Sequence, residues 1–505
     1  MCGFFITNNQ KIGLNQECVI EKFLRFRGPD GSSGLITHNT WKAYHSRLSI
    51  IDLNAGTNQP MIDVFGGLLV FNGEILNFEE LGFKYFNKKY ISDTSLLSDL
   101  LMNGNIDVDE LDGFFSFVYI DNNGVLTHAV RDKFGVKPLY YYEDDDGLSF
   151  CSEPNVLNKL YKTQPNSEAI DEYYAIRAPI FSGSYFEGVK SIEPGSCFVN
   201  GIYFDCRDYI EKGYEAYNKM DLKSALNKGI VSRLVSDAPV GLLLSRGIDS
   251  NLLKSLGSFD KYYTIGFDGD EDLVYLKSKN IINLTSIECS REEYLNAFKY
   301  LLELRGEPMS VPNEVLLYII SKKASSDGIK VLLSGEGADE FFGGYDRIFK
   351  WAHQAKEFNL EIFLDKYCYL PPSKNSKLYC KFETLFSLNK FDSVFETVRW
   401  FFIRYHMPIL FRRLDFSLMA AGVEGREPIA NMHTFIKAMK LSPDDLMGEI
   451  LGKIPLRKVT SDYLGHEFSY EQKIGFPVDL TKIFDNENNL SSYQIWFKEN
   501  LKVLL

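Results

Sequence analysis

The sequence lacks the features of a secreted or membrane protein. Its first ten residues, MCGFFITNNQ, contain neither a basic segment nor the long apolar stretch of a secretory signal. No apolar run approaches the roughly 20 residues that cross a bilayer. The eight cysteines form no C-x-x-C pair and no Cys/His cluster of the zinc type. We therefore expect a cytoplasmic protein whose cysteines, other than Cys2, are mostly reduced and buried.

Positive charge is also scarce. The 505 residues carry 55 Lys and Arg against 68 Asp and Glu, which gives a net charge of -13 at pH 7. This balance argues against a general nucleic-acid binder or a protein of anionic membranes, and it leaves a local basic patch open. The length predicts two or more domains.

The first 200 or so residues are typical of a strand-rich domain. Short runs rich in Val, Phe, Tyr and Leu are separated by Gly, Asn and Asp. In some runs apolar and polar residues alternate, and other runs are continuously apolar, as in strands buried between layers. The clearest predicted strands are 67–75, 115–121, 125–132, 139–143 and 147–152, and the last strand and turn of this half are predicted at 192–195.

From about Asp221 the pattern changes to helices alternating with strands. A helix predicted at 221–235 leads into a buried strand at 239–244, and a second unit has a helix at 314–325 and a strand at 330–333. This alternation predicts an α/β domain with a doubly wound parallel sheet, followed beyond Tyr345 by a mostly helical part. Ligands of such sheets bind at the carboxyl ends of the strands. The Ser/Gly-containing loops that follow the predicted strands at 239–244 and 330–333 lie at those ends.

Cys2 is a candidate nucleophile. Removal of the initiator Met would leave an α-amine beside the thiol, and an amine with a pKa near ~8 can act as the base for its own side chain. By itself, however, a cysteine at position two is more often a chance residue in an unstructured terminus.

Motifs that follow in a fixed order make the assignment of Cys2 specific. They are RGPD at 27–30, HSRLSIID at 45–52, FNGEI at 71–75 and SDT at 92–94, extended by LDG at 111–113 and GVKPLY at 135–140. Together they resemble the class II, N-terminal nucleophile glutamine amidotransferase domain, most closely that of glutamine-dependent asparagine synthetases. The resemblance implies an α+β layered sandwich over residues 1–205 and a synthetase domain over residues 206–505.

The resemblance also implies a role for each residue around the glutamine. Arg47 would pair with the α-carboxylate of glutamine, while Glu74 and Asp93 would hold its α-amine. The side chain of Asn72 and the backbone N–H of Gly73 would form the oxyanion hole. Without the resemblance, Asn72 and Gly73 would suit a hairpin turn, and Arg47 and Asp93 would suit surface salt bridges.

Residues 244–250, LSRGIDS, end a predicted strand and open a helix. Small residues and helix-start N–H groups there suit an anion, although this is not a Walker P-loop. The segment resembles the PP-loop of ATP pyrophosphatases, whose usual pattern is Ser-Gly-Gly-x-Asp-Ser. That resemblance implies contacts to ATP or pyrophosphate from Leu244, Ser245, Gly247, Asp249 and Ser250, with Asp249 also near Mg²⁺.

Arg246 departs from the PP-loop pattern, because it replaces a glycine that brings bare backbone to the phosphates. Two readings remain open. The side chain can swing outward or clamp a phosphate, or it can block the loop and leave a weak synthetase or a glutaminase alone.

Residues 333–345, LSGEGADEFFGGY, are the longest uninterrupted match to asparagine synthetases. Ser334, Gly335 and Glu336 would contact ATP, and Glu336 would also take a proton from the attacking ammonia. Asp339 would bind Mg²⁺, which prefers oxygen ligands. The alternative is an acidic first turn that only complements the helix dipole.

Further segments downstream support the resemblance and also limit it. Lys453, within GKIPLR, would stabilise charge on the phosphoryl group, and 414–415, 422–428 and 473–477 also fit the family. Two segments depart from it: IAN at 429–431 replaces Phe-Leu-Asp, and FSLM at 416–419 replaces Arg-Met-Ser-Met. These departures leave the identity of the acceptor open.

Over the whole chain, the resemblance implies a glutamine-hydrolysing asparagine synthetase that uses glutamine, aspartate and ATP, with Mg²⁺. Two alternatives remain. The same chemistry can serve another carboxylate, such as a sugar uronate, a peptide or a biosynthetic acid. Otherwise the chain is a glutaminase or binding subunit with a degenerate synthetase site. No nucleic-acid or membrane partner is expected, and a homodimer is left open.

Overall fold

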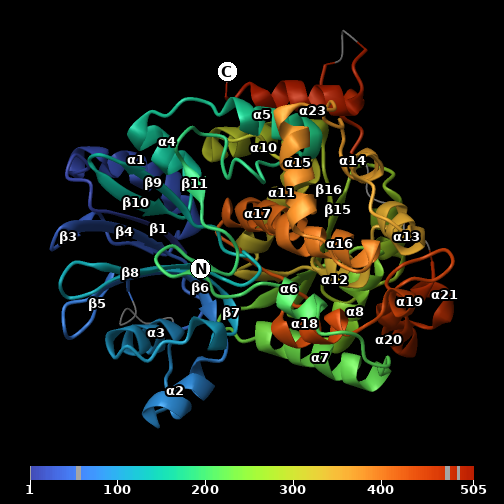
Figure 1. Cartoon of the computed structure of the whole chain (residues 1–505), viewed down its shortest axis with the longest axis horizontal. Coiled ribbons are helices and arrows are strands. Elements are labelled where there is room, and N and C mark those ends of the chain that lie inside the picture. Colours follow the sequence, from blue (N-terminus) through green and yellow to red (C-terminus); the bar gives the residue numbers. More distant parts are fainter. Residues whose placement is uncertain (1, 53–57, 472–477, 486–488, 505) are drawn as a thin grey trace.

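The structure is a computed structural model that describes residues 2–52, 58–471, 478–485 and 489–504. Figure 1 shows a sheet-rich N-terminal part beside a larger part in which helices surround a third sheet. The first sheet has the strand order β11-β9-β10-β1-β4-β2, with β3 also paired to β4. Its strands are β1 Cys2–Thr7, β2 Gly31–Ser32, β3 Ile36–His38, β4 Trp41–Arg47, β9 Tyr140–Asp144, β10 Gly147–Cys151 and β11 Lys190–Ser191.

The second sheet stacks on the first because alternating side chains of both sheets are apolar. Its order is β13-β12-β8-β7-β6-β5. Phe4 and Ile6 of β1 pack against Val70 and Val118 of this second sheet, whereas Phe5 points to the other side. The strands are β5 Met61–Ile62, β6 Leu68–Ile75, β7 Gly113–Ile120, β8 Leu126–Arg131, β12 Ser196–Cys197 and β13 Gly201–Ile202.

Helices cover the outer faces of both sheets. Phe5 packs with α1 (Leu14–Leu24) and α4 (Pro154–Tyr161), and α5 (Ser167–Ile176) joins the same cluster. On the other side, β6 and β7 pack against α2 (Phe78–Phe86) and α3 (Asp93–Met102). The predicted α+β layered sandwich is therefore confirmed.

The predicted strands of this half agree with β6 to β10 to within two residues at each end. The turn predicted within 192–195 is present at Pro194 and Gly195, but the prediction that the last strand of this half runs through this segment is wrong. Residues 192–195 lie between β11 and β12, and β12 and β13 follow them. These late strands are only two residues long, which is too short for a recognisable pattern.

The third sheet is parallel, with the order β16-β15-β14-β17-β18. Leu332 faces α11 (Asn313–Ser326) and α17 (Met407–Met419), while Val331 and Leu333 face α7 (Lys219–Arg233) and α8 (Ile248–Leu256). Helices thus cover both faces, and the predicted doubly wound α/β arrangement is confirmed. Its strands are β14 Val240–Leu243, β15 Lys261–Gly266, β16 Leu284–Glu288, β17 Val331–Leu333 and β18 Glu424–Arg426.

The part beyond Tyr345 is helical, as predicted, except that β18 joins the parallel sheet. The other helices of this half are α6 Arg207–Ile210, α9 Glu271–Ser278, α10 Arg291–Arg305, α12 Ala338–Phe342, α13 Asp346–Gln354, α14 Leu360–Tyr367, α15 Lys377–Leu388, α16 Val394–Phe401, η4 Phe402–His406, α18 Met432–Met439, α19 Pro443–Leu446, α20 Ile454–Leu464, α21 His466–Ser469, α22 Leu480–Ile483 and α23 Ser492–Leu501.

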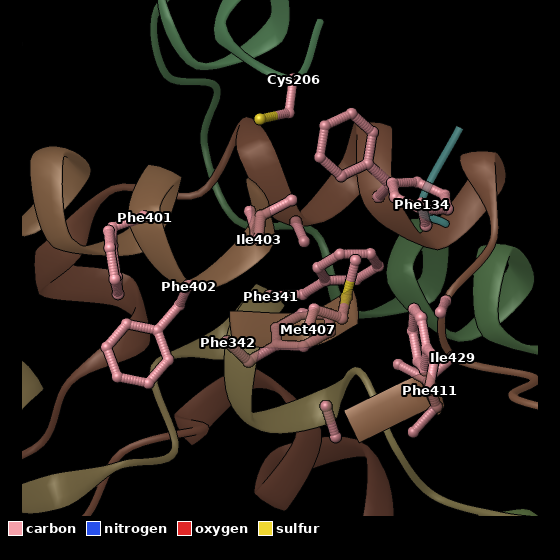
Figure 2. Packing of buried hydrophobic residues seen from close by; sticks show 14 of the residues in the cluster. Phe134, Cys206, Phe341, Phe342, Phe401, Phe402, Ile403, Met407, Phe411 and Ile429 are labelled. Carbon is pink, nitrogen blue, oxygen red and sulfur yellow. The ribbon is translucent and has the colours of Figure 1, made fainter. Parts of the chain in front are cut away.

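The two halves share a hydrophobic core (Figure 2). Phe134 from the N-terminal half lies 5.6 Å from Phe341 and 5.3 Å from Phe435, measured between ring centroids. Met407 and Ile429 belong to the same buried cluster. Because this cluster is continuous, it fixes the N-terminal sheets relative to the loops of the parallel sheet.

Candidate active sites

Cys2 lies at the start of β1, buried and directly opposite Arg47 of β4. Its backbone N–H donates to Asn72 Oδ1 at 3.1 Å. Burial raises the pKa of the Cys2 thiol, and the Leu48 N–H and the Arg47 charge oppose that rise. Desolvation therefore keeps the thiol protonated, so a nearby base is needed to activate it.

Asn72 and Gly73 of β6 present donors beside Cys2. Asn72 is fully buried, and its Nδ2 has no hydrogen-bond partner in the described part of the chain. Gly73 has φ 135°, and an added Cβ would lie 2.1 Å from the carbonyl oxygen of Phe114. Only glycine fits there, and the buried free amide can stabilise a developing oxyanion.

Replacing Asn72 by Ala is expected to slow glutamine hydrolysis about 100-fold, because one of two oxyanion donors is lost. The assay is glutamate release under saturating glutamine. Asn77→Ala, on the adjoining loop, is the control and should hydrolyse glutamine at the normal rate. An unchanged rate in folded Asn72→Ala would remove Asn72 from the oxyanion hole.

The three residues predicted to hold the ends of glutamine gather at the same place. Arg47 donates to Asn58 Oδ1 at 2.7 Å and to the Asp52 carbonyl. Asp93, at the start of α3, accepts the Ile75 N–H at 3.1 Å. Burial raises the pKa of Glu74 and of Asp93, and the Asp93 charge raises that of Glu74 further. Two neighbouring buried carboxyls suit a cationic ligand group such as an α-amine.

The predicted PP-loop joins β14 to α8 and is closed by its own hydroxyls. Ser250 Oγ accepts the Ser245 N–H at 3.1 Å, and Ser245 Oγ accepts the Gly247 N–H at 3.2 Å. The Asn251 amide donates to the carbonyls of Ser245 and Gly247 at 2.9 Å each. Leu244 is buried beneath the loop. Asn251 was missed from the sequence, although its position within the first turn of a loop-to-helix junction was a usable signal.

The side chain of Arg246, a residue of this loop, contacts residues outside the loop. Its guanidinium pairs with Glu471 and lies over the ring of Tyr275, 4.7 Å from the centroid. The backbone N–H of Arg246 reaches Asp272 Oδ2 at 3.4 Å. Of the two readings of this residue, the geometry agrees with the outward one.

Lys453 joins the two acidic residues predicted to face Mg²⁺. Its Nζ lies 2.9 Å from Asp249 Oδ2 and 2.7 Å from Asp339 Oδ1. Burial alone would lower the pKa of Lys453, but the two carboxylates hold it above its ordinary value. Lys453 also has a left-handed φ of 57°, a conformation that concentrates at functional sites.

Two glycines allow this convergence. An added Cβ at Gly335 would lie 2.8 Å from Asp249 Cβ, so the absence of a side chain lets the 334–337 loop lie against α8. At Gly344 an added Cβ would lie 1.9 Å from Asp339 Oδ1 and 2.1 Å from Lys453 Cε. Ser334 is buried at the end of β17.

Glu336 follows in the same loop and is partly exposed. Burial raises the pKa of Glu336, while Arg413 and Lys453 lower it and Asp339 and Asp249 raise it. A carboxyl with a raised pKa in such a cluster is suited to accepting a proton.

The carboxylates here are compatible with Mg²⁺ that is shared with a nucleotide. Asp249 Oδ1 is buried and has no hydrogen-bond partner among the described residues. In that part of the chain, no group of three or more His, Cys, Asp or Glu gathers as a metal cage. Mg²⁺ is commonly held by one or two carboxylates together with substrate phosphates, and Asp249 and Asp339 fit that arrangement.

Arg27, from the RGPD motif, has contacts that the sequence did not predict. Its Nε donates to the Cys2 carbonyl at 3.1 Å, and its Nη1 pairs with Glu153 at 2.6 Å and with Asp415 at 2.8 Å. Lys137 Nζ also reaches Asp415 at 3.3 Å. Asp415 lies on α17, so this buried network links the Cys2 site to the C-terminal half.

Residues of the two segments that depart from the family pattern, 416–419 and 429–431, have identifiable packing and capping contacts. Ile429 is in the shared core, and Asn431 caps α18 by accepting the Thr434 N–H at 3.0 Å. Phe416 packs edge-on against Phe26, with 5.6 Å between the ring centroids. The segment 473–477 lies outside the described residues.

Glu427 is a buried carboxyl between the two halves, and neither of its carboxylate oxygens has a hydrogen-bond partner in the described part of the chain. Burial, with the charges of Asp415 and Glu336, raises the pKa of Glu427 from 4.5 to about 8 against the opposing effect of Lys137. In the unfolded chain the proton leaves near pH 4.5, whereas in the folded protein it stays until about pH 8. Folding stability therefore falls as the pH rises between these values.

Glu427→Gln is expected to raise the free energy of unfolding above pH 8, by at most about 5 kcal/mol, and to change it little at pH 4. Denaturant unfolding at both pH values measures this. Glu187→Gln, at an exposed position, should show no such pH dependence. An equal effect of Glu427→Gln at both pH values would contradict the assignment.

Comparison with known proteins finds matches for both halves of the chain. Residues 221–496 match the family model described as asparagine synthase, and residues 1–210 match that of a glutamine amidotransferase domain. Asparagine synthetase B [glutamine-hydrolyzing] of Escherichia coli is 26% identical over 94% of this chain and 81% of its own length. Asparagine synthetase [glutamine-hydrolyzing] of Zea mays is 27% identical over 90% of this chain and 73% of its own length.

Asparagine synthetase [glutamine-hydrolyzing] 1 of Bacillus subtilis is 29% identical over 68% of this chain, and the match spans 59% of its own length. The solved glutamine phosphoribosylpyrophosphate amidotransferase of B. subtilis shares 12% identity, with a TM-score of 0.27 over 66% of this chain and 82% of that chain. A structural likeness that weak carries no functional argument.

No helix in the described part of the chain combines the length and apolar character needed to span a bilayer. The chain belongs to the asparagine synthase family and is a glutamine-dependent amido-ligase.

Proposed function

We propose that this protein converts aspartate to asparagine with ammonia from glutamine, and that ATP is split to AMP and pyrophosphate. The observation that carries the proposal is the convergence of Lys453 on Asp249 and Asp339, beside two strand-end loops. The free thiol of Cys2 supplies the ammonia-forming half, together with the buried Asn72 Nδ2, which has no hydrogen-bond partner among the described residues.

At the first site, the Cys2 sulfur attacks the side-chain carbonyl carbon of glutamine. The α-amine exposed by removal of the initiator Met takes the thiol proton. The Asn72 amide and the Gly73 N–H stabilise the oxyanion. The α-amine passes the thiol proton to the amide nitrogen, which departs as ammonia, and water hydrolyses the glutamyl thioester to glutamate and free Cys2. Arg47 binds the α-carboxylate, and Glu74 and Asp93 bind the α-amine.

At the second site, the loop of Ser245, Gly247 and Ser250 binds the ATP phosphates, and Lys453 stabilises charge on the phosphoryl group. Asp249 and Asp339 would hold Mg²⁺, which neutralises phosphate charge. The aspartate carboxylate displaces pyrophosphate to give β-aspartyl-AMP. Ammonia then displaces AMP, and Glu336 takes its proton.

We assign residues 1–205 to the glutaminase domain and residues 206–505 to the synthetase domain. Ammonia passes between the two sites through an interior tunnel that keeps it unprotonated. A cytoplasmic location and a homodimer remain predictions. The Arg246 side chain pairs with Glu471 outside the 244–250 loop, and this counts against a degenerate synthetase site.

A second candidate keeps the chemistry and changes the acceptor acid. It is favoured by Phe416, which stands where the family has Arg, since the loss of a guanidinium removes a partner for a second carboxylate. Pyrophosphate exchange into ATP, measured with aspartate, a sugar uronate and other acids, separates the two candidates. Exchange with aspartate and release of asparagine support the proposal. Exchange with another acid alone would replace aspartate as the acceptor.

A further inference from the structure

A cavity of about 670 Å³ lies between the two halves, apart from both sites described above. One wall comes from β9, β11 and the 177–183 loop, and the other from the end of α10, η4 and α17. None of the residues assigned to the glutaminase or synthetase chemistry lines it. Its volume is in the range of small-molecule binding sites.

The cavity wall is rich in cations. Arg131, Arg177, Lys190, Arg305, Arg404 and Arg412 line it, against only Glu193 and Glu307. Both carboxylates are already engaged. Glu307 lies 3.2 Å from Arg412 and 3.7 Å from Arg305, and Glu193 pairs with Arg404.

Arg131 is buried, and its guanidinium donates only to uncharged oxygens. These are the carbonyls of Lys137 at 3.0 Å, Gly135 at 2.8 Å and Ile192 at 2.8 Å, and Ser191 Oγ at 2.9 Å. Burial lowers the pKa of Arg131, and the charges of Arg412 and Arg404 lower it further. The positive charge of Arg131 is therefore not compensated by an ion pair among the described residues.

Arg177 is a second buried arginine that lines the cavity. Its Nη1 donates to the Ser310 carbonyl at 3.3 Å, while its Nε and Nη2 have no hydrogen-bond partner in the described part of the chain. The guanidinium lies over the Tyr369 ring at 3.4 Å from the centroid. The hydroxyl of Tyr185, on the same cavity, is likewise buried without a partner. Burying an unpaired guanidinium is costly, and an anion in the cavity would offset that cost.

We propose that this cavity is a binding site for a small organic anion that carries a carboxylate or phosphate group on an apolar body. Arg131 and Arg177 attract the anionic group. The apolar part is accommodated by the remaining wall, which includes Tyr140, Ile180, Phe181, Phe198, Tyr405 and Ile409. Guanidinium groups suit both oxyanions, so the shared chemistry is an oxyanion beside an aromatic or aliphatic group.

Isothermal titration calorimetry of the full chain tests this with phenyl phosphate, phenylacetate and the neutral phenylacetamide. We expect one site per chain for at least one of the anions and at least tenfold weaker binding of phenylacetamide. Arg177→Gln should weaken anion binding at least about tenfold, because a charged hydrogen-bond donor is lost. Arg291→Gln, an exposed arginine outside the cavity, should bind as the wild type does.

Tighter binding of phenyl phosphate identifies the anionic group as phosphate, and tighter binding of phenylacetate identifies a carboxylate. Ile180→Trp, which fills the cavity without removing a charge, should also weaken binding about tenfold and decides the matter if Arg177→Gln does not fold. The proposal is overturned if neither anion binds, if phenylacetamide binds equally well, or if the folded cavity variants bind as tightly as the wild type.

Discussion

Replacing Cys2 by Ala is expected to lower glutamine-dependent asparagine formation by at least about 10,000-fold while synthesis from free ammonia continues. The thioester cannot form without the sulfur, and the Asn72 amide alone offers no nucleophile. Lys453 and Glu336 do not depend on Cys2, so the second site keeps its chemistry. Glutamate release and asparagine formation, each measured with glutamine and with ammonium chloride, give both activities.

Cys18→Ala is the matched control, because Cys18 is a free, exposed cysteine on α1. It should retain both activities. A folded Cys2→Ala variant that loses ammonia-dependent synthesis as well would contradict the separation into two sites.

Replacing Lys453 by Met is expected to lower synthesis at least about 1,000-fold with either nitrogen source and to leave glutamine hydrolysis in place. The ammonium group is the cation that Asp249 and Asp339 hold at the two strand-end loops. Its loss removes the charge that stabilises the phosphoryl group and leaves two carboxylates facing the ATP phosphates. Pyrophosphate release measures synthesis, and glutamate release measures the remaining activity.

Lys458→Met is the control and should be fully active, because Lys458 is an exposed lysine on helix α20, which begins directly after Lys453. Circular dichroism confirms that both variants fold. If folded Lys453→Met still releases pyrophosphate at the wild-type rate, the synthetase site lies elsewhere.

The parts predicted best from the sequence depend on local patterns. Strands β6 to β10 and helices α7 and α11 follow from apolar periodicity and from turn residues at their ends. Both strand-end loops were predicted because helices begin directly after buried strands. Gly73 was predicted for its backbone N–H, and the structure adds that a side chain there would meet the Phe114 carbonyl.

The parts that the sequence could not predict depend on residues far apart in the chain. Arg27 and Asp415 are separated by 388 positions, and no local pattern marks two charges that meet across a core. The direction of Arg246 depends on Tyr275 and Glu471, which come from separate segments. The late strands are held by pairing rather than by their own length, because β12 pairs with β8 and β13 pairs with β12.

We propose that one chain makes ammonia at Cys2 and delivers it to an acid activated near Lys453. The most direct test of this proposal supplies the enzyme with aspartate, ATP and glutamine isotopically labelled at the amide nitrogen, in the presence of excess unlabelled ammonium. Mass spectrometry of the product then reports which nitrogen was used. We predict asparagine that carries mostly the labelled nitrogen, together with AMP and pyrophosphate in equal amounts. Product that carries only the unlabelled nitrogen, or no amide product at all, would contradict the account.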